Sequence, residues 1–269
     1  MNNGTTGQVV ASAAEFYEEF FVPALFQEWT DRVAEAANIR DGDEVLDVAC
    51  GTGALTRTVA KRVGASGSVI GLDINEDMLA VAQTKSTVNA PVIEWQQGAA
   101  ERLPFDDDSF DAVVSQFGLM FFIHPRDAIQ EMTRVLRPGG HLAIAVWDVL
   151  ENSPGYAAEV ALIQHLFGAQ AADAMRAPFT LGDKQKLGEI FTEAGLPHVT
   201  IETRDGTAQF PSVEAWVNTD VKGWTLSEMI NDAQHQQLLD RAKSELASFA
   251  NAEGAVSFRS PAHIVSVTL

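Results

Sequence analysis

Short apolar runs and amphipathic stretches alternate along the first 150 residues of the chain. The apolar runs are typical of buried strands and cover residues 44–48, 69–72, 91–95, 110–115 and 141–147. Apolar residues at helical spacing separate them, in 55–63, in a stretch that begins after Asn75, and from Pro125 to Arg137. Because strands that alternate with helices form parallel βαβ units, the pattern predicts an α/β fold with a Rossmann-like, doubly wound sheet.

Residues 12–38 have a wholly helical pattern. Ser12 and Glu15 have the spacing of a capping box, which is typical of a helix start. Pro23 is expected to interrupt this helix, because proline removes a backbone donor. Three aromatic side chains would share one face of its first part: Phe16, Phe20 and Phe21.

The second half of the chain departs from the strand–helix alternation. Residues 151–178 and 212–251 have helical patterns, and a shorter helix is expected over 187–194. Residues 199–210 and 255–269 are each expected to form one long strand. We therefore predict a mostly parallel, seven-stranded sheet with an antiparallel C-terminal strand and helical insertions.

The most informative segment joins the first strand to the next helix. Asp47 lies in the strand, Gly51 and Gly53 lie in the turn, and the following strand ends on Asp73. Glycines allow a ligand to approach the backbone, and a helix start offers free N–H groups. A carboxylate about 20 residues further on can accept hydrogen bonds from the hydroxyls of a ribose. The segment therefore predicts a site for a ligand that contains adenosine.

The spacing of the small residues distinguishes between two classes of adenosine ligand. A dinucleotide fingerprint needs G-x-G-x-x-G, and its third glycine would fall on Thr56. A carboxylate at Asp47 would also repel a pyrophosphate, whereas it suits a methionyl amine. Counted from Asp47, the pattern D-x-A-x-G-x-G resembles the first motif of the class I S-adenosylmethionine-dependent methyltransferases. An NAD-dependent oxidoreductase is the less favoured alternative.

Three further segments extend this resemblance, namely 97–105, 106–111 and 134–140. Together with the first motif they resemble the type 11, small-molecule branch of these enzymes, which includes the ubiquinone and menaquinone biosynthesis methyltransferases. The resemblance covers roughly residues 40–150. The N-terminal signature of the quinone-pathway enzymes is not visible, so we do not expect an orthologue of them.

The resemblance implies which residues bind S-adenosyl-L-methionine. The residues implied to bind the methionyl end and the ribose are Asp47, Ala49, Gly51 and Gly53. Asp73 is implied to accept hydrogen bonds from both ribose hydroxyls. Those implied at the adenine are Ile74 and Met78 on its face, and the backbone of Ala99 and Ala100 at its edge. Those implied between the methionyl group and the methyl acceptor are Ser115 and Gln116.

Two positions depart from the pattern of many relatives. Ala49 stands where glycine is common, which is a change small enough to keep the turn. Ala99 stands where an acid is common, so the adenine amino group would lose a side-chain acceptor. Such a bond contributes about 1 kcal/mol, so binding would rest more on Asp73 and on the backbone.

The resemblance implies methyl transfer from a sulfonium by in-line displacement, which depends mainly on positioning. A base is needed only if the acceptor arrives protonated. The two candidates for a catalytic role are His124, which follows the fourth strand, and Tyr17, which would reach over the cofactor from the N-terminal helix. We expect no metal site, because the acidic run 106–108 is typical of a solvated turn.

The acceptor is expected to be a small, hydrophobic or aromatic metabolite, such as a secondary metabolite or a quinone-like ring. Aromatic residues of the N-terminal helices and of the helical insertions would form the roof of its pocket, which would have few polar groups. These residues are Phe16, Tyr17, Phe20, Phe21, Tyr156, Phe179, Trp216 and Trp224. Methylation at oxygen, nitrogen, carbon or sulfur remains open.

Composition narrows the choice of partner and compartment. The formal net charge of −19 disfavours nucleic acids and anionic membranes. No apolar run approaches the length of a membrane span, and no signal peptide is evident, since the first basic residue is Arg32. The single cysteine, Cys50, excludes an intramolecular disulfide and is expected to be a packing residue. We therefore expect a cytoplasmic protein.

We predict one methyltransferase domain that spans residues 1–269. Its expected parts are a helical cap (1–38), a cofactor-binding core (39–150), helical lid insertions (151–180 and 212–252) and the C-terminal part of the sheet (181–211 and 253–269). A protein that binds S-adenosylmethionine or a metabolite without catalysis remains an alternative, because positioning leaves no obligatory catalytic residue.

Overall fold

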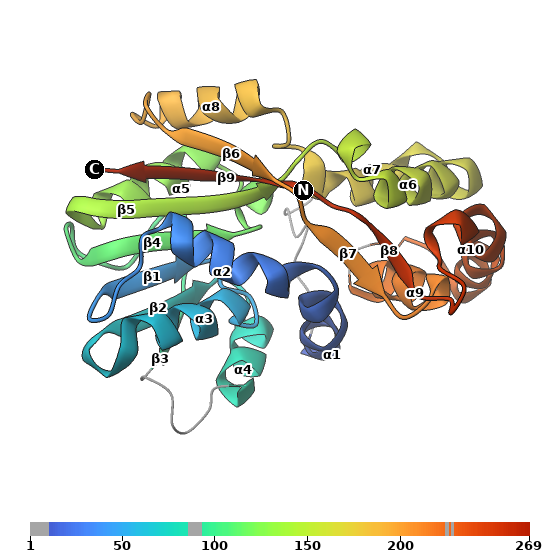
Figure 1. The fold of residues 1–269 in the computed structure, drawn as a ribbon, viewed down its shortest axis with the longest axis horizontal. Helices are drawn as coiled ribbons and strands as arrows, with labels where there is room; N and C mark the ends of the chain where they lie inside the picture. Colours follow the sequence, from blue (N-terminus) through green and yellow to red (C-terminus); the bar gives the residue numbers. More distant parts are fainter. Residues whose placement is uncertain (1–10, 86–92, 224–225, 227–228) are drawn as a thin grey trace, which may run out of the picture.

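A seven-stranded sheet forms the centre of the molecule (Figure 1). The structure is a computed structural model, which describes residues 11–85, 93–223, 226 and 229–269. The strand order is β3-β2-β1-β4-β5-β9-β6, and β9 is antiparallel to both of its neighbours. The strands are β1 (Glu44–Val48), β2 (Ser68–Asp73), β3 (Ile93–Gln97), β4 (Phe110–Gln116), β5 (Leu136–Trp147), β6 (Thr200–Arg204) and β9 (Ala262–Thr268). The predicted doubly wound fold is confirmed.

Helices cover both faces of this sheet. Val45 of β1 packs in a cluster with α2 (Gln27–Ala36) and α3 (Ala54–Val63). Its neighbour Leu46 packs in another cluster with α5 (Pro125–Arg134) and α8 (Lys184–Glu193). Alternate strand residues face opposite sides, so both faces need apolar cover. The helix α4 (Glu76–Lys85) follows β2, and Asn75 caps it by accepting from the backbone of Asp77 and Met78. Within the described ranges, no helix has the length and hydropathy needed to cross a membrane.

The N-terminal helical region differs from its prediction. The helix α1 (Ala11–Phe16) already includes Ala11, so Ser12 lies inside it and is not its N-cap residue. Pro23 does not break the helix, because residues Tyr17–Phe26 form a π-helix (η1), in which the amide of Gln27 donates to the carbonyl of Val22. A π-helix has a longer repeat than the α-helical 3.6 residues. The expected shared face of Phe16, Phe20 and Phe21 is therefore wrong: Phe20 is exposed and Phe21 is fully buried.

Before β5, the helix ends earlier and the strand begins earlier than predicted. The helix α5 ends at Arg134, and β5 begins at Leu136, so the Pro138-Gly139-Gly140 segment lies in the strand. A register shift between β4 and β5 near Phe110 accommodates it. Pro and Gly usually favour turns, but here backbone pairing keeps the segment in the strand. The amide of Gly139, for example, donates to the carbonyl of Leu269.

The two long strands predicted near the C-terminus are each two strands in different sheets. Residues 199–210 split into β6 and β7 (Thr207–Phe210), and residues 255–269 split into β8 (Val256–Arg259) and β9. The strands β7 and β8 pair with each other outside the main sheet. The chain leaves the main sheet at Gly206, where a side chain would meet the ring of Trp29 at 2.3 Å. Pro261, directly before β9, suits the other junction because it cannot donate to a strand ladder.

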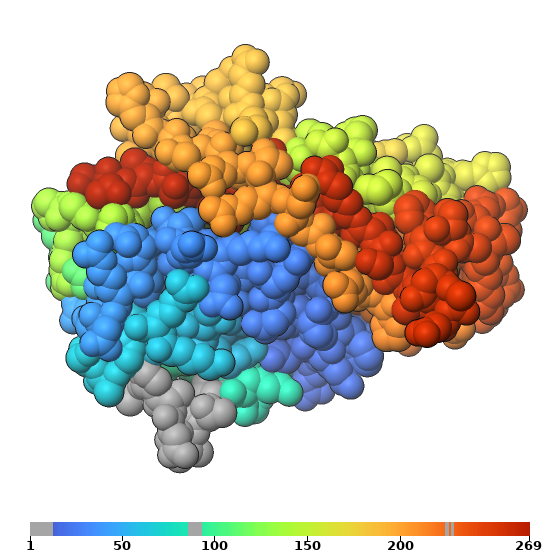
Figure 2. Space-filling view, in the orientation of Figure 1, coloured from blue at the N-terminus to red at the C-terminus, as the bar shows by residue number. Residues whose placement is uncertain are grey.

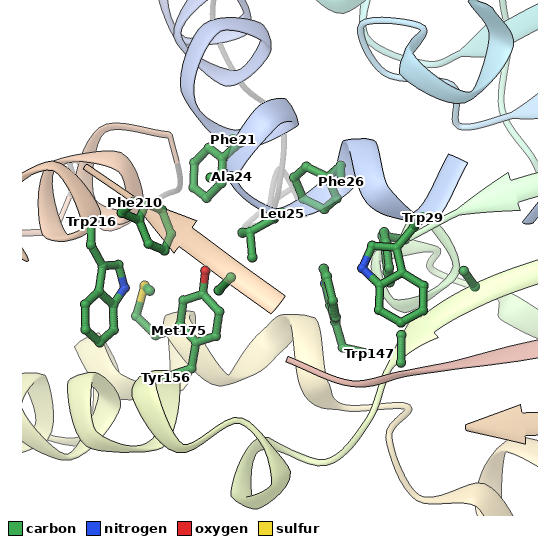
Figure 3. Packing of buried hydrophobic residues seen from close by; sticks show 14 of the residues in the cluster. Phe21, Ala24, Leu25, Phe26, Trp29, Trp147, Tyr156, Met175, Phe210 and Trp216 are labelled. Atoms are coloured by element: carbon green, nitrogen blue, oxygen red, sulfur yellow. The ribbon is translucent and has the colours of Figure 1, made fainter. Parts of the chain in front are cut away.

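The β7–β8 ribbon belongs to a second, mainly helical lobe (Figures 1 and 2). Its helices are α6 (Pro154–Phe167), α7 (Ala169–Arg176), α9 (Val213–Gly223) and α10 (Asp232–Glu245). Figure 3 shows Phe21 and Leu25 of η1 facing the lobe residues Tyr156 and Phe210. These residues share one hydrophobic cluster with α2 and α3, so the lobe and the sheet pack against the same N-terminal segment.

Candidate cofactor-binding site

One cavity lies beyond the carboxyl ends of β1, β2 and β4. This is where open α/β sheets bind their ligands, at the point where the strand order reverses. The end of β1 and the glycine turn contribute Asp47, Ala49 and Gly51 to its lining. The segment after β2 contributes Asp73, Ile74 and Met78. The other predicted residues in the lining are Ala99, Ala100, Gln116 and Tyr17.

The turn between β1 and α3 contains left-handed backbone, which glycine adopts freely and alanine only with strain. Ala49 has φ +58°, Gly51 has φ +56°, and the turn is fixed by the amide of Cys50, which donates to the carbonyl of Leu72 at 3.0 Å. A side chain at Gly51 would meet no atom within 4 Å, so the space in front of this backbone is open. The turn therefore leaves room for a ligand to lie directly against its backbone.

Asp73 connects this turn to the end of β2. One carboxylate oxygen accepts from the amide of Gly51 at 2.8 Å, and the other accepts from the amide of Asn75 at 2.8 Å. Burial raises the pKa of Asp73, although these backbone hydrogen bonds act in the opposite direction. A carboxylate has about four lone-pair positions, so each oxygen can still accept a hydroxyl from the cavity.

Asp47 lies fully buried at the base of the cavity. One of its oxygens accepts from the hydroxyl of Thr56 at 2.6 Å, and the other has no hydrogen-bond partner among the described residues. Burial raises the pKa of Asp47 to about 7, and the charge of Asp73 acts in the same direction. Two other lining residues, Thr52 and Gln116, also have a buried side-chain oxygen without a partner in the described part of the chain.

The unpartnered oxygens of the lining indicate whether S-adenosylmethionine fits the site. Buried oxygens without partners are costly unless a donor satisfies them. The methionyl ammonium offers donors and a positive charge, which would also favour the ionised form of Asp47. The donor set, the open space at Gly51 and the carboxylate of Asp73 are therefore compatible with this cofactor.

The two candidates for a catalytic role lie in different environments. Tyr17 lines the cavity, and burial raises its pKa well above its ordinary value, with Asp73 and Glu18 adding to the effect. It is therefore a hydrogen-bond donor and not a base near neutral pH. His124 is exposed, lies outside the cavity lining and makes no capping side-chain bond at the start of α5. The structure thus gives no support to His124 as a base.

Two residues expected at the cofactor lie behind the cavity wall. Ser115 is completely buried on β4 and is not part of the lining. Gly53 has φ +83°, and a side chain there would lie 2.3 Å from the ring of Trp95. Gly53 therefore permits close packing of α3 on the sheet, while Cys50, Thr52 and Ala54 of the same turn face the cavity instead.

We expect Gly53→Ala to lower the free energy of unfolding by about 3 kcal/mol, because it combines a positive φ with overpacking. Gly139 has nearly the same φ, +84°, but open space around it. Gly139→Ala should therefore cost only about 1 kcal/mol. Urea unfolding of both variants measures the difference, and equal losses would show that contact with Trp95 is unimportant.

The aromatic wall of the cavity was not predicted. Of the eight aromatic residues expected in a roof, only Tyr17 lines the cavity in the described structure; Tyr156 and Trp216 are buried in the second lobe, and Trp224 lies outside the described residues. The aromatic residues found instead are Phe26, Phe117, Phe121, Phe122 and Trp147, with the aliphatic Ile123 beside them. Phe117 directly follows β4, Phe121 to Ile123 lie in the segment after it, and Trp147 ends β5, and that position was the available signal.

Within the described ranges, no residue beyond Trp147 lines the cavity. The helices of 151–180 and 212–252 therefore pack behind η1 and do not roof the site directly. Phe117 has φ +57° and stacks on Trp147 with ring centroids 3.8 Å apart. This strained, stacked pair forms an apolar part of the cavity lining.

Comparison with known proteins supports the class that the fold and the cavity indicate, an S-adenosylmethionine-dependent methyltransferase. The chain belongs to the ubiE/COQ5 methyltransferase family, whose model matches residues 8–161. It is therefore an enzyme of the transferase class, and the NAD-dependent alternative is set aside.

Individual relatives agree with this placement. The chain is 35% identical to the demethylmenaquinone methyltransferase of Staphylococcus carnosus over 189 residues, which are 66% of this chain and 78% of that protein. It is 40% identical to the ubiquinone/menaquinone biosynthesis C-methyltransferase UbiE of Chromobacterium violaceum over 55% of this chain and 61% of that protein. The phosphoethanolamine N-methyltransferase 2 of Haemonchus contortus, solved with S-adenosylhomocysteine, shares the fold (TM-score 0.58, 17% identity, 96% of this chain and 57% of that one).

Proposed function

We propose that this methyltransferase transfers the methyl group to a small, planar, apolar metabolite that enters an aromatic end of the cavity, beside Phe117 and Trp147. In this proposal the cofactor takes a polar end, beside Asp47 and Asp73. The observation that carries the proposal is a cavity lining that combines these carboxylates with the stacked Phe117–Trp147 pair. An apolar site with few polar groups is typical of small-molecule pockets.

The same proposal assigns roles at the polar end. Asp47 binds the methionyl ammonium with its unpartnered oxygen, and Asp73 accepts from the ribose hydroxyls. Ile74, which is about half exposed at the mouth of the cavity, packs on the adenine together with Met78. The backbone at Ala99 and Ala100 meets the adenine edge.

Catalysis in this proposal rests on positioning and on the exclusion of water. S-adenosylmethionine supplies an activated methyl group when it is bound. Near the aromatic end, Tyr17 stays protonated and Phe117, Phe121 and Trp147 are apolar. Glu101 also lines the cavity, and one of its oxygens accepts from the amides of Ile123 and His124. In this proposal the acceptor arrives as a nucleophile, and the walls hold it against the cofactor.

The functional test uses labelled S-adenosylmethionine and a metabolite extract. We expect label to appear in a small organic-soluble molecule, while added RNA or DNA stays unlabelled, because the net charge of −19 repels phosphate backbones. Binding of S-adenosylhomocysteine without transfer to any metabolite would favour the alternative of a non-catalytic binder. Label in nucleic acid or protein would contradict the proposal.

We expect the affinity for S-adenosylhomocysteine to rise as the pH increases towards 7. The pKa of Asp47 is about 7, and the ligand's ammonium favours the ionised carboxylate, so binding below pH 7 must release a proton. The affinity should therefore fall by up to about tenfold per pH unit below 7. Calorimetry from about pH 5.5 to about pH 8 measures this, and Asp47→Asn should bind weakly with little pH dependence. The same slope in Asp47→Asn would assign the effect to another group.

A further inference from the structure

We propose that Arg57 is a positioning residue, which clamps the N-terminal segment over the cofactor cavity and slows release of the nucleoside. It joins Glu18 of η1 to the backbone of the glycine turn. The inference rests on the proposed cofactor site, but it concerns the pair Arg57 and Glu18, which do not themselves line the cavity.

The guanidinium of Arg57 makes two contacts on opposite sides. One nitrogen donates to the carbonyl of Thr52 at 2.6 Å, and another donates to a carboxylate oxygen of Glu18 at 2.7 Å. The side chains of Arg57 and Glu18 are only 21% and 10% exposed. By contrast, Arg62 on the same helix pairs with Asp31 at 2.9 Å, and Asp31 is 77% exposed. Solvent screens the second pair much more than the first.

The position of Arg57 is unfavourable for a cation in the absence of these partners. It lies in the first turn of α3, which contains no acidic residue, and the positive end of a helix dipole disfavours a cation there. The other oxygen of Glu18 is buried without a partner among the described residues. Removing Arg57 would therefore leave a poorly solvated carboxylate, and η1 would have to move to hydrate it.

The clamped segment contributes several residues to the cavity lining. Tyr17, next to Glu18, lines the cavity, and the longer π-helical repeat brings Val22 and Phe26 to the same face. At its other end, the fully buried Ala14 packs on Met78 and Val81 of α4. A ligand held between the glycine turn and α4 would therefore lie against this segment.

Thr52 makes the clamp sensitive to the ligand. Its carbonyl accepts from Arg57, while the residue also lines the cavity, with its hydroxyl oxygen buried and unpartnered in the described structure. A ligand that orders the glycine turn therefore also fixes the acceptor of Arg57. The clamp should close more firmly over a filled site than over an empty one.

The test is the rate at which S-adenosylhomocysteine dissociates, measured by stopped-flow fluorescence with an excess of a competing analogue. We expect Arg57→Ala to raise the dissociation rate at least tenfold and to change the association rate less than threefold. Arg57→Lys should lie between, since an ammonium cannot hold both acceptors in the same fork geometry. Arg62→Ala is the matched control and should release the ligand at the wild-type rate.

A second variant separates clamping from general stability. Glu18→Gln/Arg57→Gln removes both charges, so its melting temperature should recover relative to Arg57→Ala, while its ligand release stays fast. Wild-type release rates in this double variant would overturn the proposal, whatever the stability of Arg57→Ala. A wild-type protein that does not bind S-adenosylhomocysteine would instead refute the proposed cofactor site.

Discussion

Asp73→Ala is expected to weaken the binding of S-adenosylhomocysteine by about a hundredfold or more. Hydrogen bonds to a charged group contribute about 1.5–3 kcal/mol each, and the proposed contacts involve two ribose hydroxyls. The substitution also removes the acceptor of the Gly51 and Asn75 amides, which orient the turn and the start of α4. Isothermal titration calorimetry at about pH 8, where Asp47 is ionised, measures the loss directly.

Two controls separate the ribose contact from general effects. Glu76→Ala removes an exposed acid three residues away, so it tests loss of charge alone and should leave the affinity within about twofold. Asp73→Asn keeps one acceptor oxygen and should lie between Asp73→Ala and the wild type. An Asp73→Ala variant that folds and binds as tightly as Glu76→Ala would show that Asp73 serves only to hold the turn.

The polar end of the site could be predicted from the sequence because its determinants are local. Asp47, Gly51 and Asp73 belong to one strand–turn–helix–strand unit, in which the fold fixes the position of each strand end. Asn75 likewise caps α4 through its own neighbours. Gly53 was predicted to contact the cofactor, but the space beside it is occupied by the ring of Trp95. A glycine pattern shows where side chains are absent, and it does not show whether a ligand or a protein side chain fills the space.

The aromatic end and the second lobe depend on tertiary packing, which the sequence pattern did not show. A π-helix is rarely distinguishable by spacing, so Phe20 was placed on the wrong face of the N-terminal segment. The break between β6 and β7 follows from contact of Gly206 with Trp29, which lies far away in the sequence. A sequence pattern can indicate that an apolar residue is buried, but it does not show which distant residue packs against it.

A second large effect is expected from two acids buried in the helical lobe. Glu159 of α6 and Asp220 of α9 are 0% and 1% exposed, and their carboxyl groups interact with each other and with the side chain of Trp216. Burial raises the pKa of both groups well above its ordinary value, and for Glu159 the nearby Asp220 charge adds to the effect. The folded protein therefore holds protons that the unfolded chain releases.

We expect this pair to make the folded state less stable as the pH rises. Below about pH 4 both acids are protonated in the folded and the unfolded state, so the contribution to stability is fully present. Above that pH the unfolded chain ionises first, and the free energy of unfolding falls by up to about 1.4 kcal/mol per pH unit for each acid, until the folded pKa is passed. Urea unfolding at about pH 5 and about pH 8 measures the decline.

Neutral isosteres assign the decline to the pair. Glu159→Gln/Asp220→Asn cannot ionise, so it should be more stable than the wild type at pH 8, and the difference should shrink as the pH falls towards 5. Glu214→Gln, at an exposed acid of α9, should follow the wild type at both values. A stability difference that does not change with pH would mean that the two acids have the same pKa folded and unfolded, and would contradict their burial in this lobe. Because the lobe packs on the segment that carries Tyr17, a confirmed decline would also predict faster loss of bound S-adenosylhomocysteine at alkaline pH.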